Sequence, residues 1–223
     1  KVAIPPMPLE TAKQHCEILK DRVARIRALG FSCGLNILDT LGHHPERMDE
    51  ALQGSWTCMT NSDGEICPGS RCMNDPAYRE QYLRPLYRLH CDVHPDFIWI
   101  DDDIRYGHLP VGFCCFCDNC LRKFNAAFHH DFDRPALKAA LENPDNVALR
   151  KEWLLHQSDN ITGLLRFLRQ VVDESDSSIM LGLMTGDRYF EGYDFAAWAD
   201  ALSDSGKHAI MWRPGGGAYV DQP

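Results

Sequence analysis

Two runs between residues 97 and 120 decide the fold and the site of this chain: Phe97-Ile98-Trp99-Ile100-Asp101-Asp102-Asp103 and Cys114-Cys115-Phe116-Cys117-Asp118-Asn119-Cys120. The first run is apolar over the length of a β-strand and ends in three consecutive carboxylates. A continuous apolar run is typical of a strand that is buried on both faces, as in parallel sheets. We therefore expect a buried strand that carries carboxylates at its end, with a metal-binding cysteine loop beside it.

Strands and helices alternate along the rest of the sequence. Strands are predicted at residues 31–39, 97–101, 178–185 and 208–213. Amphipathic helices are predicted at 11–29, from Pro76 with a kink at Pro85, after Pro45, after Asp133, from Asp145 to about 174, and at 195–202. Residues 53–75 are predicted to form a long, turn-rich loop. This order indicates an α/β fold with a parallel sheet.

Polar and aromatic residues gather directly after each predicted strand. They are His43 and His44, Asp101 to Asp103, Tyr189 and Glu191, and Trp212 and Arg213. The active sites of (β/α)8 TIM barrels are built from loops in these positions. Four strands make half of such a barrel, so we predict one domain over residues 1–223 that is a segment of a (β/α)8 barrel. An open doubly wound sheet is the alternative.

The composition is that of an ordinary soluble globular domain, with 44% hydrophobic and 25% charged residues in a chain of 223. The net charge of −9 argues against a nucleic-acid partner, because phosphate binding needs clustered Lys and Arg. No apolar run approaches the roughly 18 to 20 residues of a membrane span. The first ten residues lack the apolar segment of a signal peptide, although a leader removed before Lys1 is compatible with the sequence. The composition leaves the oligomeric state open, including a homo-oligomer.

The three aspartates are the candidate catalytic group. Adjacent carboxylates repel one another, so at least one of them needs a raised pKa or a cationic partner, and Arg105 is close in sequence. A carboxyl group with a raised pKa is what glycoside hydrolysis requires of its general acid. Two other interpretations are a solvated acidic turn and a divalent-cation site.

The cysteines form a candidate metal site. Cys115, Cys117 and Cys120 place three thiolates in one tight loop, and a tetrahedral zinc site needs a fourth ligand. Cys72 is the best candidate, with Cys67 or Cys58 behind it, and Cys114 offers an alternative register. Four thiolates would make the zinc structural, since no position remains open for water. Reduced or disulfide-paired cysteines without metal are the alternative. Reduced thiolates around zinc favour a cytoplasmic location.

A family resemblance is carried by two segments, Thr60-Asn61-Ser62-Asp63-Gly64 and Gly69-Ser70-Arg71-Cys72-Met73-Asn74-Asp75-Pro76-Ala77-Tyr78-Arg79-Glu80, followed by the cysteine motif. Over roughly residues 20–125 the chain resembles glycoside hydrolase family 42, the β-galactosidase-like enzymes of clan A. There a Cys-Pro-Asn-Ser-Pro-Ala-Tyr-Arg motif supplies one zinc thiolate, and Cys-x-Cys-x2-Cys supplies three. The matching positions here are Cys72, Cys115, Cys117 and Cys120.

The resemblance implies a (β/α)8 barrel that hydrolyses a β-linked, galactoside-like sugar with retention, beside a structural zinc. It assigns the acid/base position to Asp103, where the family has Glu, and the sugar-binding Asn position to Asp102. The family's nucleophile lies on a later strand, and Glu191 is the in-chain residue best placed to substitute.

The sequence is therefore consistent with three functions. The first is a glycosidase in which Asp103 acts as acid/base, Asp101 and Asp102 assist, and the substrate contacts come from His43, His44, Arg105, Tyr189, Glu191, Trp212 and Arg213. The second is a carbohydrate-binding barrel without catalysis. The third is a metal-dependent hydrolase that uses the three aspartates and His43 or His44 as ligands.

Overall fold

The computed structural model describes residues 6–42, 55–101, 104–108, 112–184 and 194–213. Its main sheet is parallel and has the strand order β1-β4-β7-β8, formed by Gly34–Ile37, Phe97–Ile100, Met180–Met184 and Ile210–Arg213. The order follows the chain, so successive right-handed crossovers place their helices on the same face. A doubly wound sheet requires a reversal of strand order, which these four strands do not show. The fold is thus α/β, built of parallel β/α units arranged as in part of a (β/α)8 barrel.

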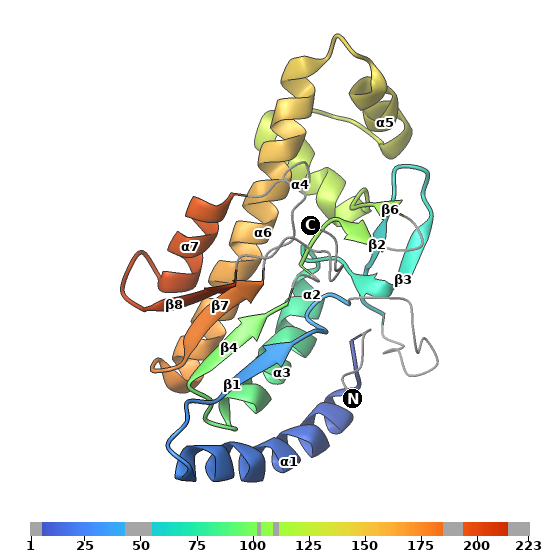
Figure 1. Cartoon of the computed structure of the whole chain (residues 1–223). Helices are drawn as coiled ribbons and strands as arrows, with labels where there is room; N and C mark the ends of the chain where they lie inside the picture. The colour runs from blue at the N-terminus through green and yellow to red at the C-terminus, as the bar shows by residue number, and fades with distance from the viewer. Residues whose placement is uncertain (1–5, 43–54, 102–103, 109–111, 185–193, 214–223) are drawn as a thin grey trace, which may run out of the picture.

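The main helices form a layer that follows the order of the strands. Helix α1 (Leu9–Ala28) contacts α3 (Arg84–Cys91), α3 contacts α6 (Val147–Asp176), and α6 contacts α7 (Phe195–Ser203). Figure 1 shows α3 and α6 behind the sheet and α1 along the β1 edge. None of the described helices is both long and apolar enough to cross a bilayer.

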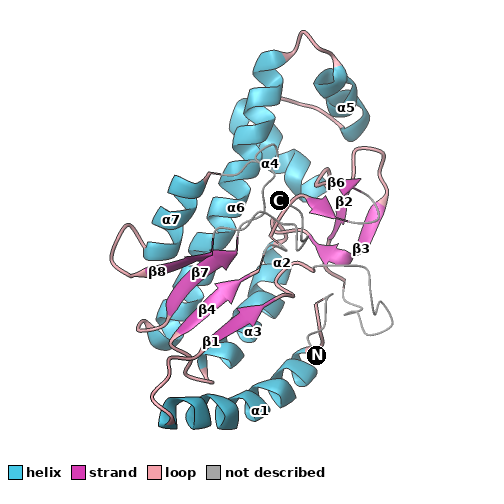
Figure 2. Cartoon of the chain, in the orientation of Figure 1, coloured by secondary structure: helices cyan, strands magenta, loops and turns pink. Residues whose placement is uncertain are grey.

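Smaller elements lie beyond the carboxyl ends of the strands, as Figure 2 shows. They are the hairpins β2–β3 (Cys58–Thr60, Ile66–Arg71) and β5–β6 (Gly107–His108, Gly112–Phe113), and the helices α2 (Pro76–Tyr78), α4 (Asp118–Phe128) and α5 (Arg134–Glu142). The turn η1 (Arg79–Leu83) continues α2 into α3. The expected interruption near Pro85 takes the form of η1, a π-helical turn, because proline has no N–H for the regular ladder.

The prediction of a loop at residues 53–75 is wrong for much of that segment. The turn signal at residues 61–64 belongs to the connection of the β2–β3 hairpin, where the Asn61 side-chain oxygen accepts from the backbone N–H groups of Asp63 and Glu65, at 3.0 and 2.9 Å. Strand β3 contains Pro68 and Gly69, both of low strand propensity, which concealed it in the sequence. The helix predicted after Pro45 lies outside the described residues.

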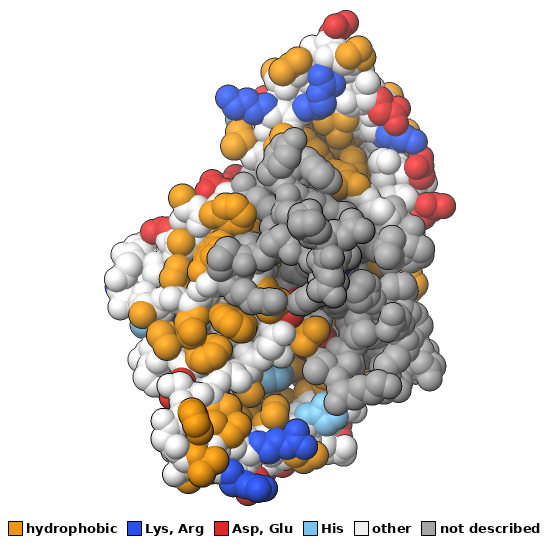
Figure 3. Space-filling model, in the orientation of Figure 1, with side chains coloured by type: hydrophobic (Ala, Val, Ile, Leu, Met, Phe, Trp, Pro, Cys, Tyr) orange, Lys and Arg blue, Asp and Glu red, His pale blue; other side chains and the backbone are white. Residues whose placement is uncertain are grey.

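The two faces of the sheet differ. One face buries Leu and Ile side chains in the main core, namely Leu35, Ile37, Ile98, Ile100, Leu181 and Leu183. The opposite face carries the half-buried rings of Phe97 and Trp99, whose centroids are 5.4 Å apart. Trp99 lies over Gly182, where a Cβ atom would be 2.4 Å from the Trp99 ring. Figure 3 views the molecule from this open face, where hydrophobic side chains gather over the strands.

The segment after β1 is anchored by buried polar groups. The Tyr78 hydroxyl donates to the Thr40 carbonyl at 2.7 Å, and the Thr40 and Tyr87 hydroxyls are 2.9 Å apart. Beside them Asp39 is 2% exposed, and its Oδ2 is buried without a hydrogen-bond partner among the described residues. Burial raises the pKa of Asp39 to about 7, against a smaller opposing effect of backbone N–H donors. The fold therefore favours the neutral form of this side chain.

Asp39 should make the stability of the protein depend on pH. Its pKa is raised in the folded state, so its contribution is complete below about pH 4 and is lost as the pH rises through about 7. Each unit of pKa difference corresponds to about 1.4 kcal/mol. We expect Asp39→Asn, which stays neutral, to unfold at a higher temperature than wild type above about pH 8.

Thermal unfolding of wild type and variant between about pH 5 and pH 9 measures this difference. Asp21→Asn, at a carboxyl group that is 72% exposed, is the control and should follow the wild-type profile. If Asp39→Asn loses stability at alkaline pH as steeply as wild type, the buried acid is not the cause.

Candidate functional site

Asp101 is the one member of the aspartate run that the structure describes, and it is held in place by strand β1. Its backbone N–H donates to the Ile37 carbonyl at 3.0 Å, which extends the β1–β4 ladder by one step. Its Oδ2 accepts from Asn36 Nδ2 at 2.7 Å, and the residue is 4% exposed. A buried carboxylate needs such hydrogen bonds to offset its desolvation. Asp101 is therefore an oriented group at the carboxyl end of β4.

Asn36 is a site residue that the sequence reasoning missed. It lies on the open face of β1, in register with Trp99 of β4. The alternation of side chains along the predicted strand 31–39 could have placed it there. However, only the parallel pairing of β1 with β4 shows that its amide meets Asp101.

Most of the other predicted site residues lie outside the described residues: His43, His44, Asp102, Asp103, Tyr189 and Glu191. Arg213 is the last residue of β8, and the structure describes its backbone but not its side chain. In the chain, the segments that contain these residues follow the carboxyl ends of the parallel strands. Their proposed roles therefore stay predictions.

Trp212 and Arg105 are described. Trp212 pairs with Leu183 in the sheet and so points to the helix-covered face, where its ring meets that of Phe195 at 5.6 Å. This places Trp212 on the opposite face of the sheet from Asn36. Arg105 is half-buried between the buried residues Ile104 and Tyr106, in the segment that leads from β4 to β5.

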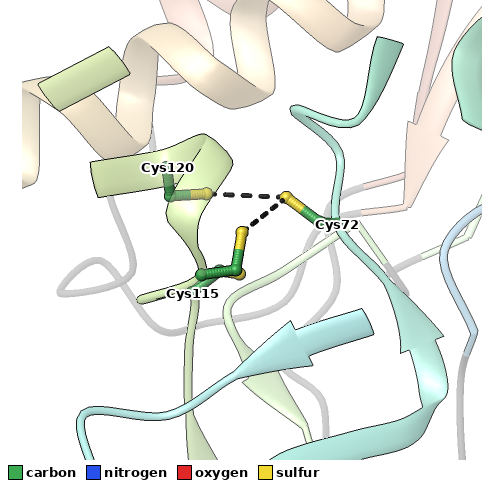
Figure 4. A group of neighbouring side chains, drawn as sticks. Cys72, Cys115 and Cys120 are labelled. Atoms are coloured by element: carbon green, nitrogen blue, oxygen red, sulfur yellow. Dashed lines mark hydrogen bonds between the residues drawn. The ribbon is translucent and has the colours of Figure 1, made fainter. Parts of the chain in front are cut away.

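The four cysteines that the sequence pairs as metal ligands come together. Cys72 follows β3, Cys115 and Cys117 precede α4, and Cys120 lies in its first turn. All four are buried, and their sulfur atoms lie within 4.8 Å of one another. The Sγ atom of Cys72 is 3.5 Å from that of Cys120 and 3.4 Å from that of Cys117. Figure 4 shows Cys72 facing Cys120 across the cluster.

This arrangement fits a tetrahedral metal ion. Four Zn–S bonds of about 2.3 Å place the sulfurs about 3.8 Å apart, close to the separations observed. No disulfide is formed by any of the ten cysteines, all of which lie in the described residues. The other candidate ligands are elsewhere engaged: the Arg71 guanidinium contacts Cys58 Sγ at 2.6 Å, and Cys114 Sγ approaches the Gly112 carbonyl at 3.6 Å. The donor set is therefore all sulfur, the set typical of structural zinc.

The electrostatics of the cluster oppose four thiolates without a cation. Hydrogen bonds from Cys115, Cys120 and Cys72 lower the pKa of the Cys117 thiol. Hydrogen bonding with Cys115 and Cys117, together with burial, raises the pKa of Cys72 and of Cys120, although the hydrogen bond with Cys72 lowers that of Cys120. The protein alone thus favours a thiolate at Cys117. A divalent cation would supply the charge that the remaining thiolates need.

The cluster is connected to the hairpin that precedes it. The backbone N–H of Phe116 donates to the Thr60 carbonyl at 2.7 Å, and Asn61 forms a bridge with Cys114. Asn119 Nδ2 donates to Thr57 Oγ1 at 3.1 Å. The loop after β4 is therefore fixed both at Asp101 and at the cysteines.

A second group of potential ligands, Asp173, Asp204 and His208, has a different explanation. Asp173 accepts from the buried Arg169 guanidinium at 2.7 Å, and Asp204 pairs with Lys207 at 2.6 Å. Cations of the protein already neutralise these carboxylates, so we assign the group to the packing of α6 against the segment after α7.

Comparison with known proteins gives structural matches alone. Protein-family models and curated proteins yield no match to the chain. Among solved structures, the chain is similar to a β-galactosidase from the Antarctic haloarchaeon Halorubrum lacusprofundi, with a TM-score of 0.60 at 18% identity. It is also similar to the β-galactosidase from the psychrophilic Marinomonas ef1, with a TM-score of 0.62 at 13% identity.

These matches include 89% and 88% of this chain but 32% of each β-galactosidase. A third match, to the β-galactosidase from Bacillus circulans sp. alkalophilus, has a TM-score of 0.55 at 16% identity and covers 93% of this chain and 33% of that one. The chain thus spans about a third of the length of these structures. At such identities the likeness shows the fold, and the closer resemblance to family 42 stays a prediction.

If the cysteine cluster holds zinc, its loss should destabilise the fold. We expect purified protein to contain one zinc per chain and Cys72→Ser to contain little, because three thiolates bind the ion more weakly than four. Chelation should lower the unfolding temperature of wild type but not that of Cys72→Ser. Elemental analysis and thermal unfolding with and without chelator measure both effects.

Cys67→Ser is the matched control, since Cys67 is buried in β3 but is not in the cluster. It should keep both the zinc and the response to chelator. Loss of zinc from the Cys67 variant rather than from the Cys72 variant would reject the ligand assignment.

Proposed function

We propose that this chain contributes the acid/base half of the active site of a glycoside hydrolase that acts on a β-linked, galactoside-like sugar. The observation that supports this most directly is the buried Asp101, which Asn36 orients at the carboxyl end of β4. Asp102 and Asp103 follow it directly in the chain. In barrels of this architecture the catalytic groups lie at the carboxyl ends of the strands. The similar solved structures are β-galactosidases.

In this proposal Asp103 donates its proton to the glycosidic oxygen as the bond to the anomeric carbon breaks. A second carboxylate attacks that carbon and forms a covalent glycosyl-enzyme. Asp103, now ionised, removes a proton from water, which releases the sugar with its original configuration. Glu191 is the in-chain candidate for the second carboxylate, and a residue beyond this chain is the other.

The remaining residues hold the substrate and the acid. Asp101 orients the segment that carries Asp103, and Asp102 hydrogen-bonds a sugar hydroxyl. Side chains from the other strand ends contact the sugar, in the proposal His43, His44, Arg105, Tyr189, Trp212 and Arg213. Trp212 points to the helix-covered face, where it contacts Phe195, and is therefore the weakest member of this set.

We further propose that Cys72, Cys115, Cys117 and Cys120 bind a structural zinc. The ion would have no open position for water, so it would take no part in the reaction. Its effect would be to fix the loop that begins at Asp101. A metal-dependent hydrolase is less well supported, because Asp101 is paired with Asn36 and belongs to neither group of potential ligands among the described residues.

The proposal predicts hydrolysis of nitrophenyl glycosides, tested over a panel of sugars. General acid catalysis contributes roughly 10²- to 10⁴-fold, so Asp103→Asn should lower kcat/KM by about that factor. The loss should be largest for leaving groups of high pKa, which depend most on protonation. Asp118→Asn, at an exposed carboxyl group in α4, is the control and should keep full activity.

Unchanged activity in Asp103→Asn would remove it from the acid/base role. If wild type binds galactosides in calorimetry without hydrolysing any member of the panel, the chain is a carbohydrate-binding barrel instead.

A further inference from the structure

Asn74 bridges two sulfurs of the cysteine cluster. Its backbone N–H donates to Cys72 Sγ and its side-chain Nδ2 donates to Cys120 Sγ, both at 3.3 Å. Its Oδ1 accepts from Lys123 Nζ at 3.1 Å. One residue thus offers two N–H donors to the cluster and a link to a surface cation. N–H donors of this kind stabilise a thiolate rather than a thiol.

The positive charge of Arg79 interacts with Cys72 and Cys120 of the same cluster. Its Nε donates to the carbonyl of Met73, the neighbour of Cys72, at 2.6 Å, and its guanidinium lies 5.8 Å from the ring centre of Phe167. Nη2 is buried without a hydrogen-bond partner among the described residues. A partly buried cation in this position requires a compensating negative charge.

Among the described residues, no carboxylate forms an ion pair with either cation. In the described part of the chain, no carboxylate oxygen lies within 4.0 Å of the charged nitrogens of Arg79 or Lys123. Glu80, which is next to Arg79 in the sequence, bonds to Arg84 Nε at 2.6 Å instead. Asp159 acts on Lys123 from beyond ion-pair distance. The cysteines Cys72 and Cys120 act on the charges of both Arg79 and Lys123, and as thiolates they would supply the balancing negative charge.

The charges balance if the cluster is a metal tetrathiolate. Four thiolates and one divalent ion carry a net charge of −2, which is unfavourable in a buried site of low dielectric. Arg79 and Lys123 together contribute +2. Groups outside the ligand shell that hydrogen-bond or charge-balance the ligands typically change metal affinity by roughly 10- to 100-fold.

We propose that Asn74, Arg79 and Lys123 form an outer shell that sets the metal affinity of the four-cysteine centre. Asn74 is the clamp that hydrogen-bonds two of the sulfurs. Arg79 and Lys123 are the cations that balance the negative charge of the centre. The inference rests on the proposed metal centre and deepens it. It requires a soft divalent ion that is bound by four thiolates, because neutral thiols would need neither the N–H donors of Asn74 nor the two cations.

Asn74→Asp tests the clamp with a side chain of the same size. The change removes the N–H donor to Cys120 and places a negative charge beside the sulfurs. We expect the dissociation constant for Zn²⁺, measured by competition with a chromophoric chelator, to rise roughly 10- to 100-fold. The sulfur-to-metal charge-transfer bands of the Co²⁺-loaded protein should shift, which a loss of packing alone would not cause.

Lys123→Met tests the counter-charge at an exposed position, where folding is not at risk. It should weaken Zn²⁺ binding several-fold, and Lys123→Arg should restore it. Asp159→Asn controls for the other charge that acts on Lys123, and Lys138→Met controls for the loss of a remote surface cation. Neither control should weaken binding. Unfolding of the chelated proteins checks that each variant folds as the metal-free wild type does.

The two levels of the proposal fail in different ways. If wild type binds neither Zn²⁺ nor Co²⁺, the metal centre itself is wrong. If wild type binds the ion and both Asn74→Asp and Lys123→Met bind it within twofold of wild type, the metal centre stands and the outer shell is wrong. Should Asn74→Asp not fold, Lys123→Met and its arginine counterpart decide the question alone.

Discussion

The structure depends most on the meeting of four buried thiols, from segments that lie far apart in the sequence. Cys72 enters from the end of the β2–β3 hairpin, and Cys115, Cys117 and Cys120 enter from the start of α4. Their separations are near those of a tetrahedron, and we propose that a divalent ion binds here and neutralises the four thiolates. The hairpin, the loop after β4 and helix α4 all converge there, so the strand end that carries Asp101 is fixed from two sides.

The sheet supplies the second constraint. Asn36 lies in β1, and Asp101 directly follows β4. The two residues are 65 positions apart in the sequence, but their strands are adjacent in the sheet. Because parallel neighbours bring their carboxyl ends to the same edge, a polar side chain on one strand can orient a carboxylate on the next. The cysteine cluster and Asp101 thus belong to segments at the same end of the sheet. We infer that the first positions the second.

The sequence predicted the regular parts of the fold well, for physical reasons. The parallel strands are short apolar runs, the long helices carry apolar residues at spacings of three and four, and Asp133 caps α5 as expected, accepting from the Ala136 N–H at 2.8 Å. The four cysteines could be grouped because short spacings constrain three of them to one loop. The β2–β3 hairpin was missed because Pro68 and Gly69 hide a strand. Asn36, Asn74 and Arg79 were missed as site residues because their roles arise from contacts between distant segments, which spacing does not encode. The placement of Trp212 on the helix-covered face was missed for the same reason.

The central claim is that a four-sulfur metal centre holds the loop beside the candidate catalytic strand end. X-ray absorption at the zinc edge of the purified protein tests it most directly, because it reports the elements bound to the ion and their distances. The account predicts four sulfur atoms at about 2.3 Å and no lighter ligand. A shell that contains nitrogen or oxygen at about 2.0 to 2.1 Å, or a protein without zinc, would contradict it.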